Sequence, residues 1–173
     1  MKQENPGINS PAPIYVQMRQ RVLETDPKTV GLVPGEVTPR VWGVMMEFIT
    51  GNTAVTLVSL TDGTTSMYFG NGGGIIGGGG DPGVAQASRD LVALAESYLE
   101  DTEIAGEIPL ISRGMIRFVI LAYQGIYAVE VPEARLFKGQ HVLVPLFNQA
   151  NRVITTLRTV QENSPVKKAK KTL

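Results

Sequence analysis

The segment best suited to chemistry is the loop at residues 70–83, GNGGGIIGGGGDPG, in which nine of fourteen positions are glycine. Within this loop, Gly72, Gly73, Gly74, Ile75, Ile76 and Gly77 match the pattern G-x-G-x-x-G. That pattern holds phosphate when it follows a strand and opens a helix, because its backbone N–H groups then point at the anion. The local context is right, since we expect a strand to end at Phe69 and a helix to begin near Val84.

Other requirements of a nucleotide site are missing, and a tract this rich in glycine meets the pattern almost by chance. A dinucleotide site needs a parallel β-α-β unit with an acidic residue about 20 positions further on, after the second strand. Position 97 falls inside the expected helix instead, and the strands look antiparallel. No Lys-Ser or Lys-Thr follows the glycines, so a P-loop is excluded as well.

Two readings of the loop stay open. Free N–H groups in the loop and at the start of the next helix could hold an anion or a peptide carboxylate, although Asp81 competes for the same positive helix end. In the structural reading, the glycines let the backbone pass close to a neighbouring surface or form a mobile flap. Because Ile75 and Ile76 would be exposed to water in an isolated loop, we expect them to dock into a groove of this chain or of a partner.

His141 and Glu47 are the other candidates. His141 is the only histidine, no G-x-S-x-G elbow accompanies it, and its polar surroundings favour a solvated or capping residue. Glu47 is the one acid inside an apolar strand, where a buried carboxylate with a raised pKa would suggest function. It stands opposite Thr56, and we expect it to face solvent or to pair with a basic side chain.

Composition excludes several classes of protein. Sixteen basic residues balance sixteen acidic ones, which argues against a nucleic-acid or membrane-surface partner. With no cysteine and one histidine, disulfides, thiolate catalysis and sulfur or multi-histidine metal sites are excluded, and no cofactor is expected. The N-terminal residues have no apolar core of the signal-peptide type, so we expect a cytoplasmic protein.

Three strands have the clearest pattern. The runs VWGVMMEFI, TAVTLVSL and TTSMYF are separated by the hairpin signals Gly51-Asn52 and Asp62-Gly63. A helix over residues 39–50 is the competing interpretation, which the Trp, Val, Phe and Ile content disfavours. Two-residue turns would place three pairs opposite one another across the strands: Phe48 with Val55, Met46 with Leu57, and Leu57 with Tyr68.

Both faces of this three-stranded unit are expected to be apolar. The expected members of one face are Trp42, Val44, Met46, Phe48, Val55, Leu57 and Tyr68. The expected members of the other are Met45, Ile49, Ala54, Val58, Leu60, Met67 and Phe69. Such a sheet needs a second cover, either another element of the chain or a second copy, and a dimer is one way to supply it.

The remaining pattern predicts helices over 13–25, 83–101 and 145–161, with a second antiparallel strand pair, GMIRFVILAY and GIYAVEV. Residues 26–40 and 132–144 are expected to be connectors. The prediction is an α+β protein with a five-stranded antiparallel sheet, in the order α-β-β-β-α-β-β-α. Residues 13–162 would form a single domain between a disordered N-terminal tail, 1–12, and a basic disordered tail, 163–173.

The element order resembles that of type III secretion chaperones and, less closely, of roadblock and profilin-like domains, which would imply a chaperone or scaffold role. At the residue level, VWGVMMEF, TLVSLTDGTTSMYF and GGGIIGGG resemble a group of small uncharacterised bacterial proteins. That resemblance implies no activity and no site.

Function can be predicted only broadly. The two apolar faces, a charged fraction of 18% and the lack of a catalytic set favour a non-catalytic protein-binding domain, of the scaffold or chaperone kind, that acts as a homodimer. The alternative is a domain that binds a small ligand or anion through the glycine-rich loop, residues 70–83. A hydrolase built on His141 ranks third.

Overall fold

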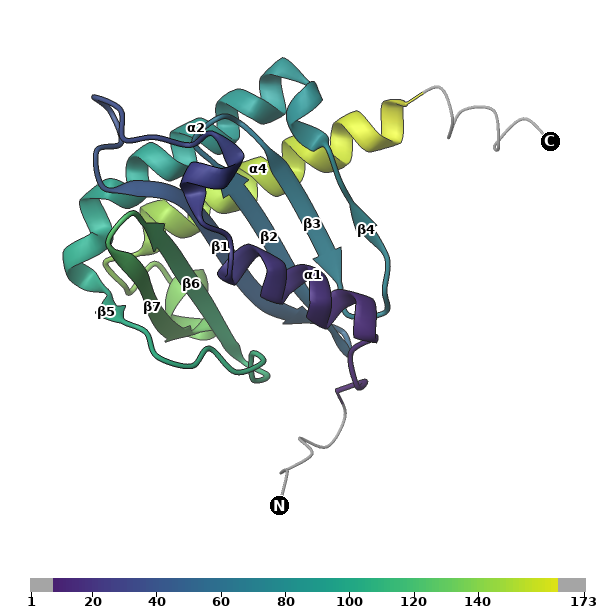
Figure 1. Ribbon diagram of the computed structural model, residues 1–173. Coiled ribbons are helices and arrows are strands. Elements are labelled where there is room, and N and C mark those ends of the chain that lie inside the picture. Colours follow the sequence, from purple (N-terminus) through teal and green to yellow (C-terminus); the bar gives the residue numbers. More distant parts are fainter. Residues whose placement is uncertain (1–7, 165–173) are drawn as a thin grey trace.

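The protein is a single antiparallel sheet with helices on both faces, and the computed structural model describes residues 8–164 (Figure 1). The helices are α1 (Pro13–Leu23), α2 (Pro82–Ala95), α3 (Glu133–Phe137) and α4 (Val144–Asn163). The strands are β1 (Val41–Thr50), β2 (Thr53–Leu60), β3 (Thr65–Phe69), β4 (Gly74–Ile75), β5 (Glu103–Ile104), β6 (Met115–Ala122) and β7 (Gly125–Pro132). Short 3-10 helices cover Pro27–Val30, Gly78–Gly80 and Glu96–Asp101.

The α+β class and the antiparallel sheet are confirmed, but the predicted strand number and element order are wrong. The sheet has seven strands, in the order β4-β3-β2-β1-β6-β7-β5, rather than five. The additional strands, β4 and β5, are two residues long and form the two edges. Strands this short carry no sequence periodicity and exist only because a longer neighbour offers them an edge. A further helix, α3, lies within the expected connector 132–144.

The first hairpin has the predicted register and the second does not. Phe48 pairs with Val55 and Met46 with Leu57, as the Gly51-Asn52 turn requires. In the second hairpin, Leu57 faces Met67 rather than Tyr68. The turn holds one more residue than expected, because Leu60 N–H donates to Thr64 O and Gly63 lies between them with a φ of 89°. A shift of one residue moves Met67, Tyr68 and Phe69 to opposite faces from those predicted.

Trp42 also lies on the other face from the one predicted. The β1–β6 register shifts between Val41 and Gly43, so that Val41 packs with the α2–α4 core and Trp42 packs on the α1 side. Such an irregularity breaks the strict alternation of a strand. The indole Nε1 of Trp42 donates to Ala122 O at 3.2 Å, which satisfies its N–H inside the core.

Two long helices cover one face of the sheet, which we call the helix-pair face (Figure 1). Asp81 accepts hydrogen bonds from Gly83 and Val84 and so caps α2, and Pro82 occupies its first turn. The fully buried apolar residues of α2 and α4 here are Val84, Leu91, Val92, Ala95, Leu146, Ala150, Val153 and Leu157. They pack on Val44, Met46, Leu57, Phe118 and Ile120 of the sheet.

The opposite face, which we call the α1 face, is covered by a single short helix and by irregular segments. Tyr15 of α1, Leu32 of the connector after it and Ile111 of the segment before β6 are all buried there. They pack against the sheet residues Trp42, Met45, Ala54, Val58, Tyr68, Val119 and Leu121. Both faces of the sheet are therefore covered by this chain itself. Their burial gives no argument for a second copy of the chain.

The predicted tails fall mostly outside the described residues. Of the N-terminal tail, residues 8–12 are described; Asn9 N–H donates to Asn52 O at 3.0 Å and Ala12 N–H to Gly70 O at 2.7 Å. Helix α4 continues to Asn163, just beyond the predicted domain boundary. Within residues 8–164, no helix is both long and apolar enough to cross a bilayer.

Candidate functional site

Four charged side chains, Arg19, Glu47, Arg117 and Glu130, form an ionic cluster on the α1 face. Arg19 Nε donates to Glu47 Oε1 at 2.5 Å, and Arg19 Nη2 donates to Oε2 at 3.1 Å. Arg117 donates from Nη1 to Glu47 Oε2 at 2.8 Å and from Nε to Glu130 Oε1 at 2.9 Å. The Glu47 side chain is 0% exposed. A carboxylate buried this deeply needs such partners, because an unpaired charge is strongly penalised in the core.

Hydroxyl groups extend the cluster toward the start of α1. Thr56 Oγ1 donates to Glu47 Oε1 at 3.2 Å, and the hydroxyls of Tyr15 and Thr56 are 2.8 Å apart. Burial raises the pKa of Tyr15; the Thr56 hydrogen bond opposes this shift and the Glu47 charge adds to it. The chain Tyr15–Thr56–Glu47 thus ties the first turn of α1 to the middle of β1 and β2.

The cluster also holds the segment that precedes β6. Arg19 Nη2 donates to the carbonyls of Ile108 and Pro109, both at 3.0 Å, and Arg117 Nη1 donates to Pro109 O at 2.5 Å. Both oxygens of Glu47 and both arginines are therefore engaged within the chain. A catalytic acid or base must reach a substrate proton, and here that geometry is filled by protein donors. We interpret the cluster as a fastening of α1 and residues 108–109 onto the sheet.

Glu47 was expected either to face solvent or to pair with a basic side chain. It pairs with two arginines and does not face solvent. Its partners are 28 and 70 residues away in the chain and were not foreseen. One signal was available: Glu47 and Arg117 are each the only charged residue in an otherwise apolar strand. Two such residues of opposite charge are natural partners when they lie on neighbouring strands.

His141 has a local structural contact. Its Nδ1 accepts from the backbone N–H of Leu143 at 3.2 Å, and its carbonyl accepts from Val144 at 3.2 Å, where α4 begins. This is a local turn contact just before α4, whose N-cap residue Leu143 makes no side-chain capping bond. Within residues 8–164, no group of three or more His, Cys, Asp or Glu residues is arranged to hold a metal ion.

The glycine-rich loop packs closely against its own chain. A Cβ on Gly79 would overlap the Gly63 carbonyl, and one on Gly78 would overlap the Leu157 side chain. At Gly74, a Cβ would stand 2.9 Å from the Met67 carbonyl. At these positions a larger residue would push the loop off β3 and α4, so glycine is required by close approach of the backbone.

Several backbone N–H groups of the loop are used within the chain. Gly72 donates to Phe69 O, Gly80 donates to Gly77 O, and Gly73 donates to the Asn71 side chain. At the start of α2, the Asp81 carboxylate already accepts from two N–H groups. The residues predicted for ligand binding, Gly72, Gly73, Gly74, Ile75, Ile76 and Gly77, thus lie along one edge of the sheet instead of encircling a point. Anion binding there stays a prediction.

The two isoleucines of the loop point to opposite faces. Ile75 packs with Val55, Met67 and Leu157 on the helix-pair face. Ile76 is 68% exposed and lies beside Ile14, which is 50% exposed, on the α1 face. Docking of Ile75 into a groove of its own chain is therefore seen, whereas Ile76 projects from the surface.

Two hollows flank β4, one on each face. On the helix-pair face, a groove of about 580 Å³ runs between the sheet and α4; its floor includes Phe48, Phe69 and Ile75. On the α1 face, a smaller hollow of about 160 Å³ is lined by Ile14, Met18, Tyr68, Gly72–Gly74 and Ile76. The smaller hollow is mainly apolar, whereas the groove has an apolar floor with Thr50, Arg158, Gln161 and Glu162 also in its lining. β4 residues line both.

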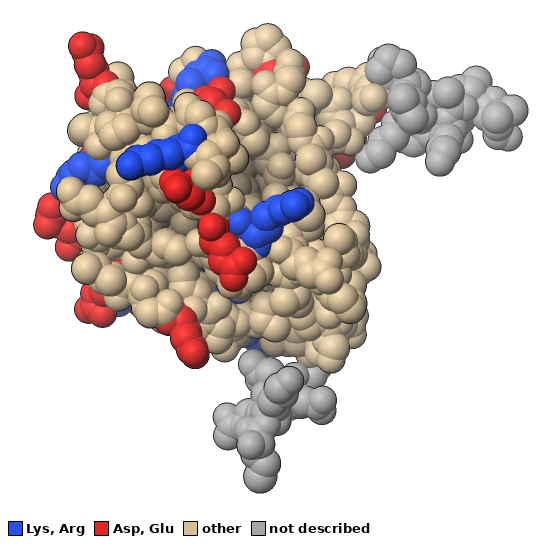
Figure 2. All heavy atoms as spheres, in the orientation of Figure 1, with Lys and Arg blue, Asp and Glu red and all other residues tan. Residues whose placement is uncertain are grey.

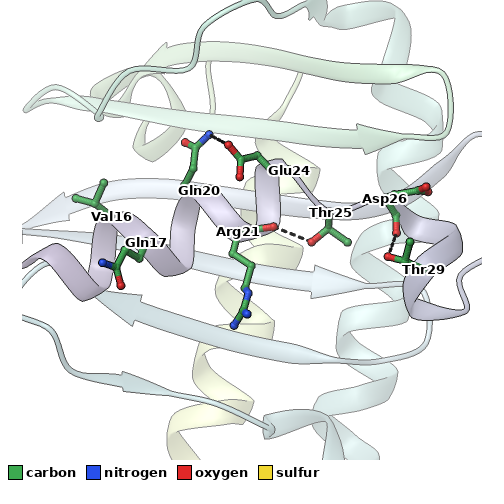
Figure 3. Close-up of a pocket in the computed structure, with 8 residues that line it drawn as sticks. All are labelled: Val16, Gln17, Gln20, Arg21, Glu24, Thr25, Asp26 and Thr29. Atoms are coloured by element: carbon green, nitrogen blue, oxygen red, sulfur yellow. Dashed lines mark hydrogen bonds between the residues drawn. The ribbon is translucent and has the colours of Figure 1, made fainter.

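A third and larger hollow, about 680 Å³, lies along the outer side of α1 and the turn that follows it (Figure 3). It is shallow, and several of its polar groups pair with one another: Gln20 donates to Glu24, Thr25 to Arg21 O and Thr29 to Asp26 O. The side chains of Gln17 and Arg21 are drawn without a hydrogen bond and point in different directions. No set of unpaired groups converges there among the residues drawn. Size alone does not make this hollow a binding site.

The two edges of the sheet differ in charge. Residues 8–18 and 63–80, which build the surface around β4, contain no charged residue. In Figure 2 the corresponding region, at the lower right over β4 and the start of α1, is tan. At the other edge, four acidic residues and no basic residue occupy 100–107, and all four are exposed: Glu100, Asp101, Glu103 and Glu107.

Comparison with known proteins adds no assignment. No family model, no curated protein and no solved structure matches this chain. The resemblances suggested by its sequence therefore remain resemblances, and its candidate site rests on its own geometry: a sheet edge built from the uncharged residues 63–80, with a hollow on each side.

Proposed function

We propose that this protein is a non-catalytic protein-binding module that acts as a homodimer, and that its binding surface is the sheet edge at β4. The observation that carries the proposal is the contrast between the two edges. One is uncharged, with the exposed isoleucines Ile14 and Ile76, and the other is acidic.

An exposed sheet edge carries unpaired N–H and C=O groups that can pair with another chain. Proteins protect such edges with charged side chains, and Glu103 and its acidic neighbours do so at β5. Nothing comparable protects β4 within the described residues: 63–80 are uncharged and include no proline. An edge left open in this way is a natural place for association.

The distribution of polar groups supports a role without chemistry. The charged side chains buried on the α1 face are engaged in the ionic cluster, and His141 is engaged just before α4. Among the described residues, the Tyr123 hydroxyl on this face is buried without a hydrogen-bond partner. The smaller hollow beside β4 is lined mainly by apolar side chains and glycine, and the larger groove combines an apolar floor with Arg158 and Glu162 of α4. Such a lining suits the side chains of another protein better than it suits the reacting groups of a substrate.

Light scattering coupled to size-exclusion chromatography tests the proposal. We expect a particle of twice the chain mass of 18.7 kDa at micromolar concentration, with dissociation on dilution. Added salt should leave the dimer intact, because an uncharged interface gains little from Coulomb attraction. A mass of one chain throughout the concentration series would exclude the homodimer.

A further inference from the structure

We propose that two copies join β4 to β4 in antiparallel register about a twofold axis, so that the two sheets become one. Each copy would place its isoleucines in the apolar hollows beside the other copy's edge. The inference rests on the proposed homodimer and specifies which surface forms it.

The backbone of β4 has groups available for this pairing. β4 pairs with β3 through Met67 opposite Ile75 and Tyr68 opposite Gly74, and Phe69 N–H donates to Gly73 O at 2.9 Å. In an antiparallel ladder, hydrogen-bonded and non-bonded pairs alternate. Gly73 therefore bonds inward to β3, and Gly74 directs its N–H and C=O outward, where a partner strand can meet them.

Side-chain alternation makes the edge complementary to itself. Residues opposite each other in an antiparallel ladder share a face of the sheet. The partner's Ile75 would thus lie over the groove on the helix-pair face, and the partner's Ile76 would lie beside Ile14 on the α1 face. A single short segment supplies both the hollows and the side chains that fill them, which is what a twofold interface requires.

The distribution of charge favours an interface between two β4 edges over an interface between two β5 edges. In a twofold contact residue i meets residue j and j meets i, and only residues close to the axis meet their own equivalents, so a charged residue near the axis meets a like charge. Residues 63–80 carry no charge, and the two charged residues that line the groove beside β4, Arg158 and Glu162, have opposite signs. A contact through β5 would instead bring the acidic segment 100–107 against a second acidic segment. A charged or polar partner would find no complementary group among residues 63–80.

The absence of cysteine allows a direct test of this geometry. Ile76→Cys creates a chain with a single thiol at the proposed interface, and Ile104→Cys provides the matched control. Ile104 is 76% exposed in β5, against 68% for Ile76, so the two thiols are similarly accessible. Each variant is treated with a short thiol-reactive crosslinker at micromolar concentration and separated on a denaturing gel.

We expect most of the Ile76→Cys protein to become a covalent dimer and most of the Ile104→Cys protein to remain single chains. If the wild type is a dimer by light scattering but Ile76→Cys does not crosslink, or Ile104→Cys crosslinks equally well, the interface lies elsewhere and the inference is wrong while the homodimer stands. A monomeric wild type would overturn both proposals.

A charge at the same two positions gives an independent measurement. Ile76→Glu should weaken dimerisation about tenfold or more, because association would bury two carboxylates close together. Ile104→Glu should leave the dissociation constant unchanged. Both side chains are mostly exposed in the single chain, so circular dichroism should show an intact fold for both. Equal dissociation constants for the two variants would contradict the inference.

Discussion

The two faces of the sheet are both buried, but they are held by different forces. On the helix-pair face, α2 and α4 contribute a stripe of aliphatic side chains, and the contact is apolar apart from buried hydroxyl contacts of Ser88 in α2 with Ser59 and Thr65 of the sheet. On the α1 face, the only fully covered side chains of α1 are Tyr15 and Arg19, and both are hydrogen-bonded to polar groups of the sheet. One face depends on area buried and the other on the completeness of an ionic cluster.

This difference predicts different sensitivities. Apolar contact is non-directional, so a change in it costs free energy in proportion to the area or cavity involved. A buried ionic cluster contributes little net stability while intact and costs much when one partner is lost, because another charge is then left unpaired. Loss of one member of the ionic cluster should therefore lower the free energy of unfolding sharply, whereas substitutions on the helix-pair face should lower it in proportion to the volume removed.

The largest effect is expected from Glu47→Gln, which removes the acid that both Arg19 and Arg117 bind. Loss of one member of a buried ion pair costs about 3–5 kcal/mol, so unfolding in urea should shift strongly. Glu103→Gln, an exposed acid, serves as the control and should stay close to wild type. A loss below about 1 kcal/mol for Glu47→Gln would mean that the cluster does not hold the α1 face.

Leu91→Ala tests the helix-pair face. Leu91 of α2 is 0% exposed, and its truncation should lower the free energy of unfolding by about 2–5 kcal/mol by leaving a cavity. This loss should be the same at low and high salt, since no charge is involved, and urea titrations at both salt concentrations measure it. A strongly salt-dependent loss would contradict the assignment of this face to apolar packing.

Arg19→Met should cost less than Glu47→Gln, because Glu47 keeps Arg117 as its partner. We expect a loss of about 1–3 kcal/mol from the hydrogen bonds removed, with the methylene packing of the side chain partly retained. Amide hydrogen exchange should become faster across α1 and stay unchanged across α2. Equal acceleration in both helices would show that α1 is not a separately fastened element.

Tyr15→Phe should have the smallest effect, about 1 kcal/mol at neutral pH, from loss of the hydrogen bond to Thr56. The substitution should also change how the stability of the protein falls at alkaline pH. Burial raises the pKa of Tyr15, so the unfolded chain ionises first, and stability present below about pH 10 is lost as pH rises through the folded pKa.

The variant should therefore lose less stability than wild type between neutral and strongly alkaline pH, as melting temperatures at both would show. Some alkaline loss should persist, since burial also raises the pKa of Tyr68. An identical alkaline fall in wild type and variant would mean that Tyr15 is ionised as readily in the folded chain as in the unfolded one.

The local sequence pattern predicted much of the fold and little of the candidate site. The three main helices, the five longer strands and the β1–β2 register follow from periodicity, caps and turn residues close in sequence. The β2–β3 register failed because Asp62-Gly63 fits both a two-residue and a three-residue turn, and only packing of the strands selects between them. The glycine-rich loop was noticed, but its place at an open edge depends on β3.

By itself, the sequence determined that this chain forms an antiparallel sheet, apolar on both sides, with α2 and α4 as amphipathic helices, because those patterns repeat over neighbouring residues. Tertiary structure alone decided that Glu47 meets Arg19 and Arg117, that Trp42 and Tyr68 lie on the α1 face, and that two short strands form edges of different charge. These features join residues far apart in the chain, and their pairing depends on distances that exist only after folding.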